Sequence, residues 1–148
     1  KHKNLTWILN AAKKNPEYNF VLTGNDSFSN ESEELNREKV DNVIFTGFVS
    51  DGEMKALMLN CEALIQPSFY EGFGIPPIEA LSMGKKIIVA KASCLPEIYE
   101  DSAIYIDPNN SDVGLNLLMK EPVGDAKYIL EKHSWKKSAK EMLKLIGS

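Results

Sequence analysis

The hydrophobic positions of this chain follow two different periodicities. Leu5, Ile8, Leu9 and Ala12 have the i, i+3, i+4, i+7 spacing of an amphipathic helix that ends before Pro16. Short apolar runs typical of buried strands occur at residues 20–22, 43–45, 63–65, 87–89 and 104–106. Such strands, separated by helices, predict βαβ units and a parallel sheet covered by helices on both faces.

Local signals place further helices between and after these strands. Ser50 and Glu53 have the spacing of a capping box, which predicts a helix with Met54, Leu57 and Met58 on its apolar face. A second helix is expected to begin at Pro76-Pro77, because proline is tolerated in a first helical turn. The remaining helices are expected over residues 31–39, 111–120, 123–133 and 134–146.

These elements predict an α/β fold with a Rossmann-like parallel sheet, in a single domain over residues 1–148. There is no internal repeat and no low-complexity linker. A doubly wound sheet normally begins with a strand, whereas this chain opens at Lys1, without a Met, on a helical pattern. We therefore expect that the first strand is truncated and that the chain is a fragment of a longer protein.

Composition excludes several classes of protein. Seventeen basic and 21 acidic residues give a net charge of −4, which disfavours a nucleic-acid partner. No apolar run approaches the roughly 20 residues of a membrane span, and the N-terminus lacks the apolar region of a signal peptide. Cys61 and Cys94 form no CxxC pattern, so a disulfide scaffold and a zinc site are both disfavoured, and a cytoplasmic location is expected.

The segment richest in candidate chemistry is residues 67–81, which reads PSFYEGFGIPPIEAL. It follows a predicted strand and opens a predicted helix, where open α/β sheets bind their ligands. Gly72 and Gly74 allow a tight turn and a close approach of the backbone to a ligand. The N–H groups of Gly72, Phe73, Gly74 and Ile75, with the helix dipole, make a candidate site for a phosphate anion.

Two glutamates flank this candidate anion site. Carboxylates repel phosphate oxygens, so Glu71 and Glu79 are expected to accept hydrogen bonds from hydroxyl groups instead. A sugar and a ribose supply such hydroxyls on either side of a diphosphate, which indicates a nucleotide-sugar site. Lys3, at the start of the first helix, is the candidate for offsetting the phosphate charge.

The Glu71-x7-Glu79 spacing within Glu-Gly-Phe-Gly-Ile-Pro resembles the E-x7-E motif of the group 1 (family 4) retaining glycosyltransferases of the GT-B fold. The resemblance extends over essentially the whole chain. Its other parts are Lys3-Asn4, Phe45-Thr46-Gly47-Phe48-Val49-Ser50, Ser82-Met83-Gly84-Lys85-Lys86-Ile87-Ile88, Leu95-Pro96-Glu97-Ile98 and Ser134-Trp135. Lys86 stands where the family typically has proline.

This resemblance implies a donor-binding C-terminal domain and a role for each matching residue. Glu71 would contact the transferred sugar, and Lys3 would bind the diphosphate leaving group. Glu79 would bind the ribose hydroxyls. The amides of residues 72–75 would hold sugar and diphosphate, and the backbone from Gly47 to Val49 would lie against the base.

The resemblance also implies properties of a whole enzyme. It would transfer a sugar from a UDP-, GDP- or ADP-sugar to a hydroxyl acceptor, with retention and without a bound metal or cofactor. An N-terminal acceptor domain would complete it, and the enzyme could lie peripherally at the inner membrane face. The family's diphosphate-binding arginine would precede Lys1, and the one arginine present, Arg37, lies in the wrong region. The isolated chain is therefore expected to bind donor weakly and to transfer nothing.

Other interpretations of the same residues stay open. The alternatives for the whole domain are a GT-B nucleotide-sugar epimerase relative and a non-catalytic binding or scaffolding module. Glu79 alone would suit any helix start, and Lys3 alone would be an ordinary solvated lysine. His133 is expected at a helix C-terminus. The stripe of Trp135, Ala139, Met142, Leu143 and Ile146 predicts a core-facing helix, and any exposed part of that stripe would favour self-association.

Overall fold

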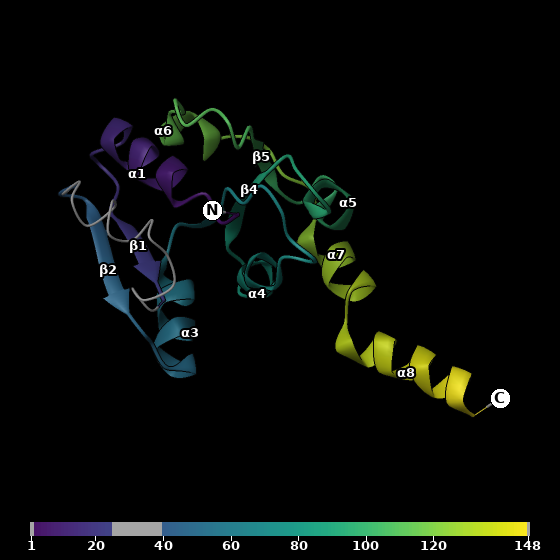
Figure 1. Ribbon diagram of the computed structural model, residues 1–148. Helices are drawn as coiled ribbons and strands as arrows, with labels where there is room; N and C mark the ends of the chain where they lie inside the picture. Colours follow the sequence, from purple (N-terminus) through teal and green to yellow (C-terminus); the bar gives the residue numbers. More distant parts are fainter. Residues whose placement is uncertain (1, 25–39, 148) are drawn as a thin grey trace.

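The computed structural model describes residues 2–24 and 40–147, and the helix expected over residues 31–39 lies outside them. Figure 1 shows the arrangement of the elements. These are α1 (Leu5–Lys14), β1 (Phe20–Thr23), β2 (Val43–Gly47), α3 (Asp51–Asn60), β3 (Ala63–Gln66), α4 (Ile75–Ser82), β4 (Lys86–Ala90), α5 (Leu95–Tyr99), β5 (Ile104–Ile106), α6 (Leu115–Leu118), α7 (Ala126–Lys132) and α8 (Trp135–Ile146). All five predicted strands and the α/β class are confirmed.

The larger sheet has the parallel order β3-β4-β5, with Ile65 opposite Ile88 and Ile88 opposite Ile104. Successive side chains of a strand point to opposite faces, so β4 contributes to two cores. Ile87 and Val89 pack with residues of α4, α5 and α7, whereas Ile88 packs with α1 and α6. This sheet is therefore covered on both faces, as predicted.

The second sheet, in the described part of the chain, pairs β1 with β2, also parallel. Phe20 of β1 joins the core beneath α1, while Val21, Ile44 and Phe45 are exposed. Among the described residues, β1 and β3 are not hydrogen-bonded to each other, so the strands form two sheets rather than one. A doubly wound order would place its first strand between them. That the chain lacks such a strand stays a prediction.

The helices follow the sequence signals with three differences. The capping box at α3 is formed, with the Ser50 hydroxyl accepting from the Glu53 N–H and the Glu53 carboxylate accepting from the Ser50 N–H. The Glu53 carboxylate also accepts from the Ser50 hydroxyl, and the two bonds that it accepts from Ser50 lower its pKa. In contrast, α5 was not predicted, α6 covers four residues of the expected 111–120, and α7 is shorter than the expected 123–133. His133 is the C-cap of α7, as predicted.

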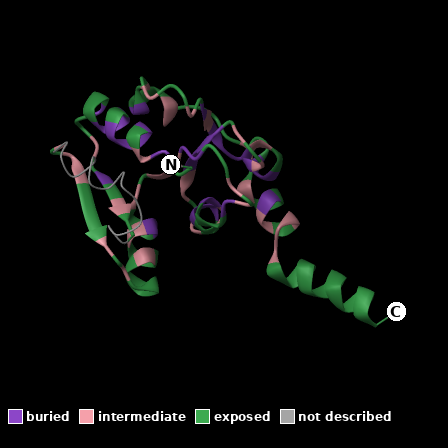
Figure 2. Ribbon diagram, in the orientation of Figure 1, coloured by how far each residue is buried: buried purple, intermediate pink, exposed green. Residues whose placement is uncertain are grey.

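The expectation that α8 faces a core is wrong. Helix α8 has no buried residue, and its apolar stripe from Trp135 to Ile146 is exposed along its length. Figure 2 shows this helix projecting from the body with an exposed surface throughout. Amphipathic spacing predicts an apolar face, but no other described element covers the one that α8 presents.

Candidate functional site

The candidate site is built on residues 67–74, here called the glycine loop, which connect the carboxyl end of β3 to α4. Within the described part of the chain, the N–H groups of Gly72, Phe73, Gly74 and Ile75 donate no hydrogen bond. The next two residues of α4 are prolines and carry no N–H. The unpaired donors of this helix start are therefore concentrated in the residues predicted to bind an anion.

Gly74 is fixed by residues of α5. Its φ of +83° is the left-handed conformation that glycine adopts without strain, and a Cβ at this position would lie 2.8 Å from Leu95 Cδ2. The hydroxyl of Tyr99 donates to the Gly74 carbonyl oxygen, and burial raises the pKa of that phenol. Only glycine fits this position, which turns the chain into α4.

The main chain of Glu71 is fixed by the turn after β4. The Ser93 hydroxyl donates to the Glu71 carbonyl oxygen at 2.9 Å and accepts from the Glu71 N–H at 3.4 Å. The Cys94 thiol also donates to this carbonyl, at 3.1 Å. These contacts leave the half-buried Glu71 carboxylate without a hydrogen bond to another described residue. The backbone is thus held while the carboxylate stays available to a ligand.

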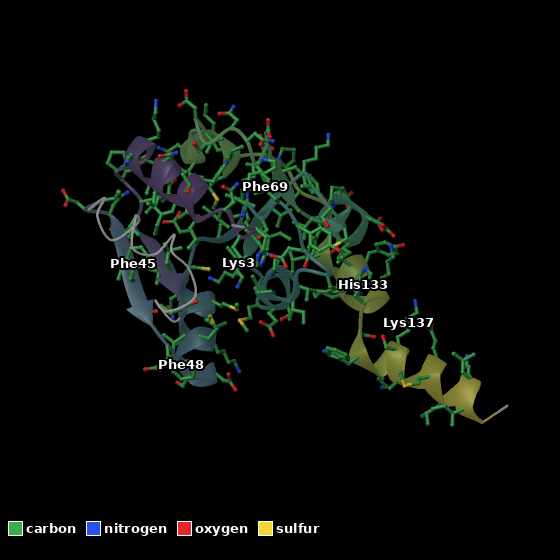
Figure 3. The ribbon with its side chains drawn as sticks, viewed as in Figure 1. Lys3, Phe45, Phe48, Phe69, His133 and Lys137 are labelled. Atoms are coloured by element: carbon green, nitrogen blue, oxygen red, sulfur yellow. The ribbon has the colours of Figure 1, made fainter. Side chains whose placement is uncertain are left out.

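Lys3 lies beside the glycine loop because its two neighbours are attached to that loop. The Phe69 N–H donates to the His2 carbonyl oxygen at 2.9 Å, and Asn4 Nδ2 donates to the Pro67 carbonyl oxygen at 3.1 Å. Asn4 Nδ2 also donates to the Pro108 carbonyl oxygen at 2.7 Å. The Lys3 side chain is exposed, and Figure 3 shows it near the centre of the molecule.

The other predicted residues occupy two places. Glu79 is exposed in the second turn of α4. Gly47, with a φ of +67°, and Val49 lie at the carboxyl end of β2, on the smaller sheet. Glu71, residues 72–75 and Glu79 thus lie on the glycine loop and on the helix that follows it, and Lys3 lies between two residues that are hydrogen-bonded to the start of that loop. Gly47 and Val49 belong to the other sheet.

The sequence did not predict that three further residues contact the glycine loop. Ser93 and Tyr99 hold the glycine loop from the turn after β4 and from α5. His133 packs edge-on against the ring of Phe73, with ring centroids 5.3 Å apart. Pro96, at the second position of α5, is a helix-start signal that could have located this helix. No sequence pattern indicates that His133 meets Phe73.

Two further searches were negative over the residues that the structure describes. No group of three or more histidine, cysteine, aspartate or glutamate side chains is placed to hold a metal ion. No helix in these ranges has the length and apolar character to cross a membrane.

Comparison with known proteins gives concordant matches. The family described as "Glycosyl transferases group 1" matches residues 1–142. The O-antigen chain mannosyltransferase RfbU of Salmonella typhimurium is 33% identical over 113 residues, which are 74% of this chain and 32% of RfbU. The O-antigen chain mannosyltransferase B of Escherichia coli is 37% identical over 68 residues, 46% of this chain and 18% of that protein.

A solved structure shares the fold of nearly the whole chain. The Anabaena protein Alr3699/HepE, crystallised with UDP and glucose, superposes with a TM-score of 0.82 at 20% identity, over 99% of this chain and 45% of HepE. The chain thus spans less than half the length of HepE and about a third of the length of RfbU.

Proposed function

Because the chain belongs to the group 1 glycosyl transferases, we propose that its glycine loop binds the diphosphate of a nucleoside diphosphate sugar. The observation that carries this proposal is the run of four N–H groups from Gly72 to Ile75, at the start of α4, that have no hydrogen-bond partner among the described residues. Backbone N–H groups at a helix N-terminus favour an anion, and we assign to the exposed Lys3, whose two neighbours are hydrogen-bonded to the start of the loop, the positive charge that offsets the diphosphate.

The carboxylates and the smaller sheet complete the proposed donor site. Glu71 accepts hydrogen bonds from hydroxyls of the transferred sugar, and Glu79 from the ribose. The backbone of Gly47 and Val49 lies against the base. Departure of the nucleoside diphosphate is assisted by Lys3 and the loop amides, with no metal ion and no cofactor.

The activity proposed for the whole enzyme is transfer of a hexose to a hydroxyl acceptor with retention. RfbU carries the name mannosyltransferase and HepE was crystallised with UDP and glucose, which supports a hexose donor. The acceptor and part of the catalytic groups are assigned to a second domain. We place the enzyme in the cytoplasm, since Cys61 and Cys94 are free thiols, with peripheral contact at the inner membrane face.

The test is a calorimetric titration of this chain with UDP, GDP and ADP, repeated with Glu79→Gln. Glu79→Gln replaces a charged acceptor with two oxygens by a neutral amide with one acceptor oxygen, which should weaken binding by about 1–3 kcal/mol. Glu131→Gln is the matched control, because Glu131 is an exposed carboxylate on α7. We expect one nucleotide to bind best, Glu79→Gln to weaken it and Glu131→Gln to bind like the parent chain.

Two results would count against the proposal. Equal affinity of the parent chain and Glu79→Gln would remove Glu79 from the site. Absence of binding by all three nucleotides at millimolar concentration, in this chain and in one extended at its N-terminus, would reject the donor site as a whole.

A further inference from the structure

Within the glycine loop, Gly72 and Phe73 are less restrained by backbone hydrogen bonds than Glu71 and Gly74 on either side of them. Glu71 is held by Ser93 and Cys94, and Gly74 by Tyr99. Between them, the N–H groups of Gly72 and Phe73 have no partner within the described chain. The conformation of these two residues therefore depends on what holds the Phe73 side chain.

Phe73 is held against the core and against one histidine. Its half-buried ring packs on the core that includes Leu95 and Ile129. The ring also meets His133 in an edge arrangement, with an interplanar angle of 78° and a centroid separation of 5.3 Å. This is a favourable geometry for two aromatic rings.

His133 is a fixed point because α7 is anchored on the same core. The His133 N–H donates to the Ile129 carbonyl oxygen at 3.0 Å, and the Ile129 side chain is fully buried. The Asp125 carboxylate caps the start of α7. Near its end, Lys132 pairs with Glu100 at 2.5 Å, and this hydrogen bond raises the pKa of the lysine.

The imidazole of His133 also carries an uncompensated polar atom. Its Nε2 is buried and has no hydrogen-bond partner among the residues that the structure describes. Such an atom lowers stability, so its hydrogen bonding does not account for the ring at this position. The side-chain contact that the structure shows for this ring is the one with Phe73.

We propose that His133 is a positioning residue for the donor site, acting through Phe73 to set the conformation of residues 72–73. The inference rests on the proposed function, since it concerns the same loop amides that would bind the diphosphate. The inference assigns this role to the aromatic ring of His133 and none of it to the unpaired Nε2.

The test compares three variants of the chain. His133→Ala removes the ring, His133→Phe keeps an aromatic ring without the unpaired nitrogen, and Tyr128→Ala removes an exposed ring from the same helix. We expect His133→Ala to raise the Kd of the preferred nucleoside diphosphate by about two- to tenfold. His133→Phe should restore the parent Kd, and Tyr128→Ala should leave it unchanged.

A second measurement reads the loop without any nucleotide. In amide NMR spectra of the ligand-free protein, His133→Ala should shift the Gly72 and Gly74 signals, and Tyr128→Ala should not. Unchanged signals and an unchanged Kd in His133→Ala would overturn the inference, as would a failure of His133→Phe to rescue. If the parent chain binds no nucleotide while the signals shift, it is the proposed function that fails, and the loop contact stands.

Discussion

The two sheets of this molecule are made from similar strands but are covered very differently. In the β3-β4-β5 sheet, Ile88 is 1% exposed, with helices on both faces. In the β1-β2 sheet, Ile44 is 48% exposed, although it lies in an equally apolar run. The difference comes from neighbours rather than from composition.

This difference bears on where the candidate site lies. The glycine loop follows β3 of the larger sheet. It is held by residues after β4 and in α5, and both of these elements pack into the core of that sheet. The smaller sheet contributes only Gly47 and Val49, at its carboxyl end. The groups proposed to meet the diphosphate and the sugar are thus on the better-packed part, and those proposed to meet the base are on the less covered one.

The largest effect is expected from shortening equivalent side chains in the two sheets. Ile88→Ala removes a fully buried side chain and should lower the free energy of unfolding by about 2–5 kcal/mol. Ile44→Ala should cost less than about 1 kcal/mol, because that side chain is half solvated. Urea denaturation of both variants measures the difference, and equal losses would show that the two sheets are equally packed in solution.

A smaller effect is expected from adding a methyl group at two left-handed glycines. Gly74→Ala combines backbone strain with overlap against Leu95, and should cost about 2–4 kcal/mol and weaken nucleotide binding. Gly47→Ala has a similar φ but nothing within 4 Å of its Cβ, so about 1–2 kcal/mol is expected. Thermal unfolding and nucleotide titration of both variants measure these losses. A larger loss of stability in Gly47→Ala than in Gly74→Ala would contradict the prediction.

The Tyr99 hydroxyl offers a third comparison, with pH as the variable. Tyr99→Phe loses the bond to Gly74 and should cost about 1 kcal/mol at pH 7. Because burial raises the pKa of this phenol above its unfolded value near 10, its contribution is complete below pH 10 and is lost as pH rises further. The variant should therefore show a shallower alkaline loss of stability. An unchanged slope between pH 9 and 11 would contradict this.

The smallest effect on stability is expected from replacing Trp135, whose exposure differs most clearly from that of the other tryptophan, Trp7. Trp135 is 85% exposed, whereas Trp7 is 2% exposed and donates to the Asn110 carbonyl oxygen at 2.8 Å. Iodide should quench the Trp135 fluorescence and spare that of Trp7. Trp135→Phe should remove the quenched fraction and change stability by no more than about 0.5 kcal/mol. A protected Trp135 would mean that α8 is covered in solution, for example by a second copy of the chain.

The sequence predicted those elements that are determined by residues close together in the chain. The five strands, the capping box of Ser50 and Glu53 and the helix begun by the two prolines all rest on short-range chemistry, and the structure confirms them. Helix α5 is five residues long, too short for an amphipathic period to be recognised. In the expected 111–120 helix, the first four residues are not helical. The N-cap of α6 is Gly114, and the N–H of Asp112 donates to the Asn110 side chain before the helix begins.

Features that depend on long-range partners were not predictable in the same way. The stripe of α8 has the spacing of a core face, and only the arrangement of the other elements shows that nothing covers it. The same limit applied to the site. Glu71, Glu79 and the two glycines stand out by their spacing, whereas Ser93, Tyr99 and His133 act on the loop across 22 to 60 positions of sequence.

The attachment of His2 and Asn4 to the glycine loop has a consequence for the entropy of binding. Ordering the backbone of one residue costs about 1–2 kcal/mol. At Lys3 this cost is met when the chain folds, because the residues on both sides are hydrogen-bonded to the loop. When an anion binds Lys3, only the torsions of the lysine side chain remain to be ordered. The entropy cost of binding at this residue is therefore smaller than it would be if the backbone were also free.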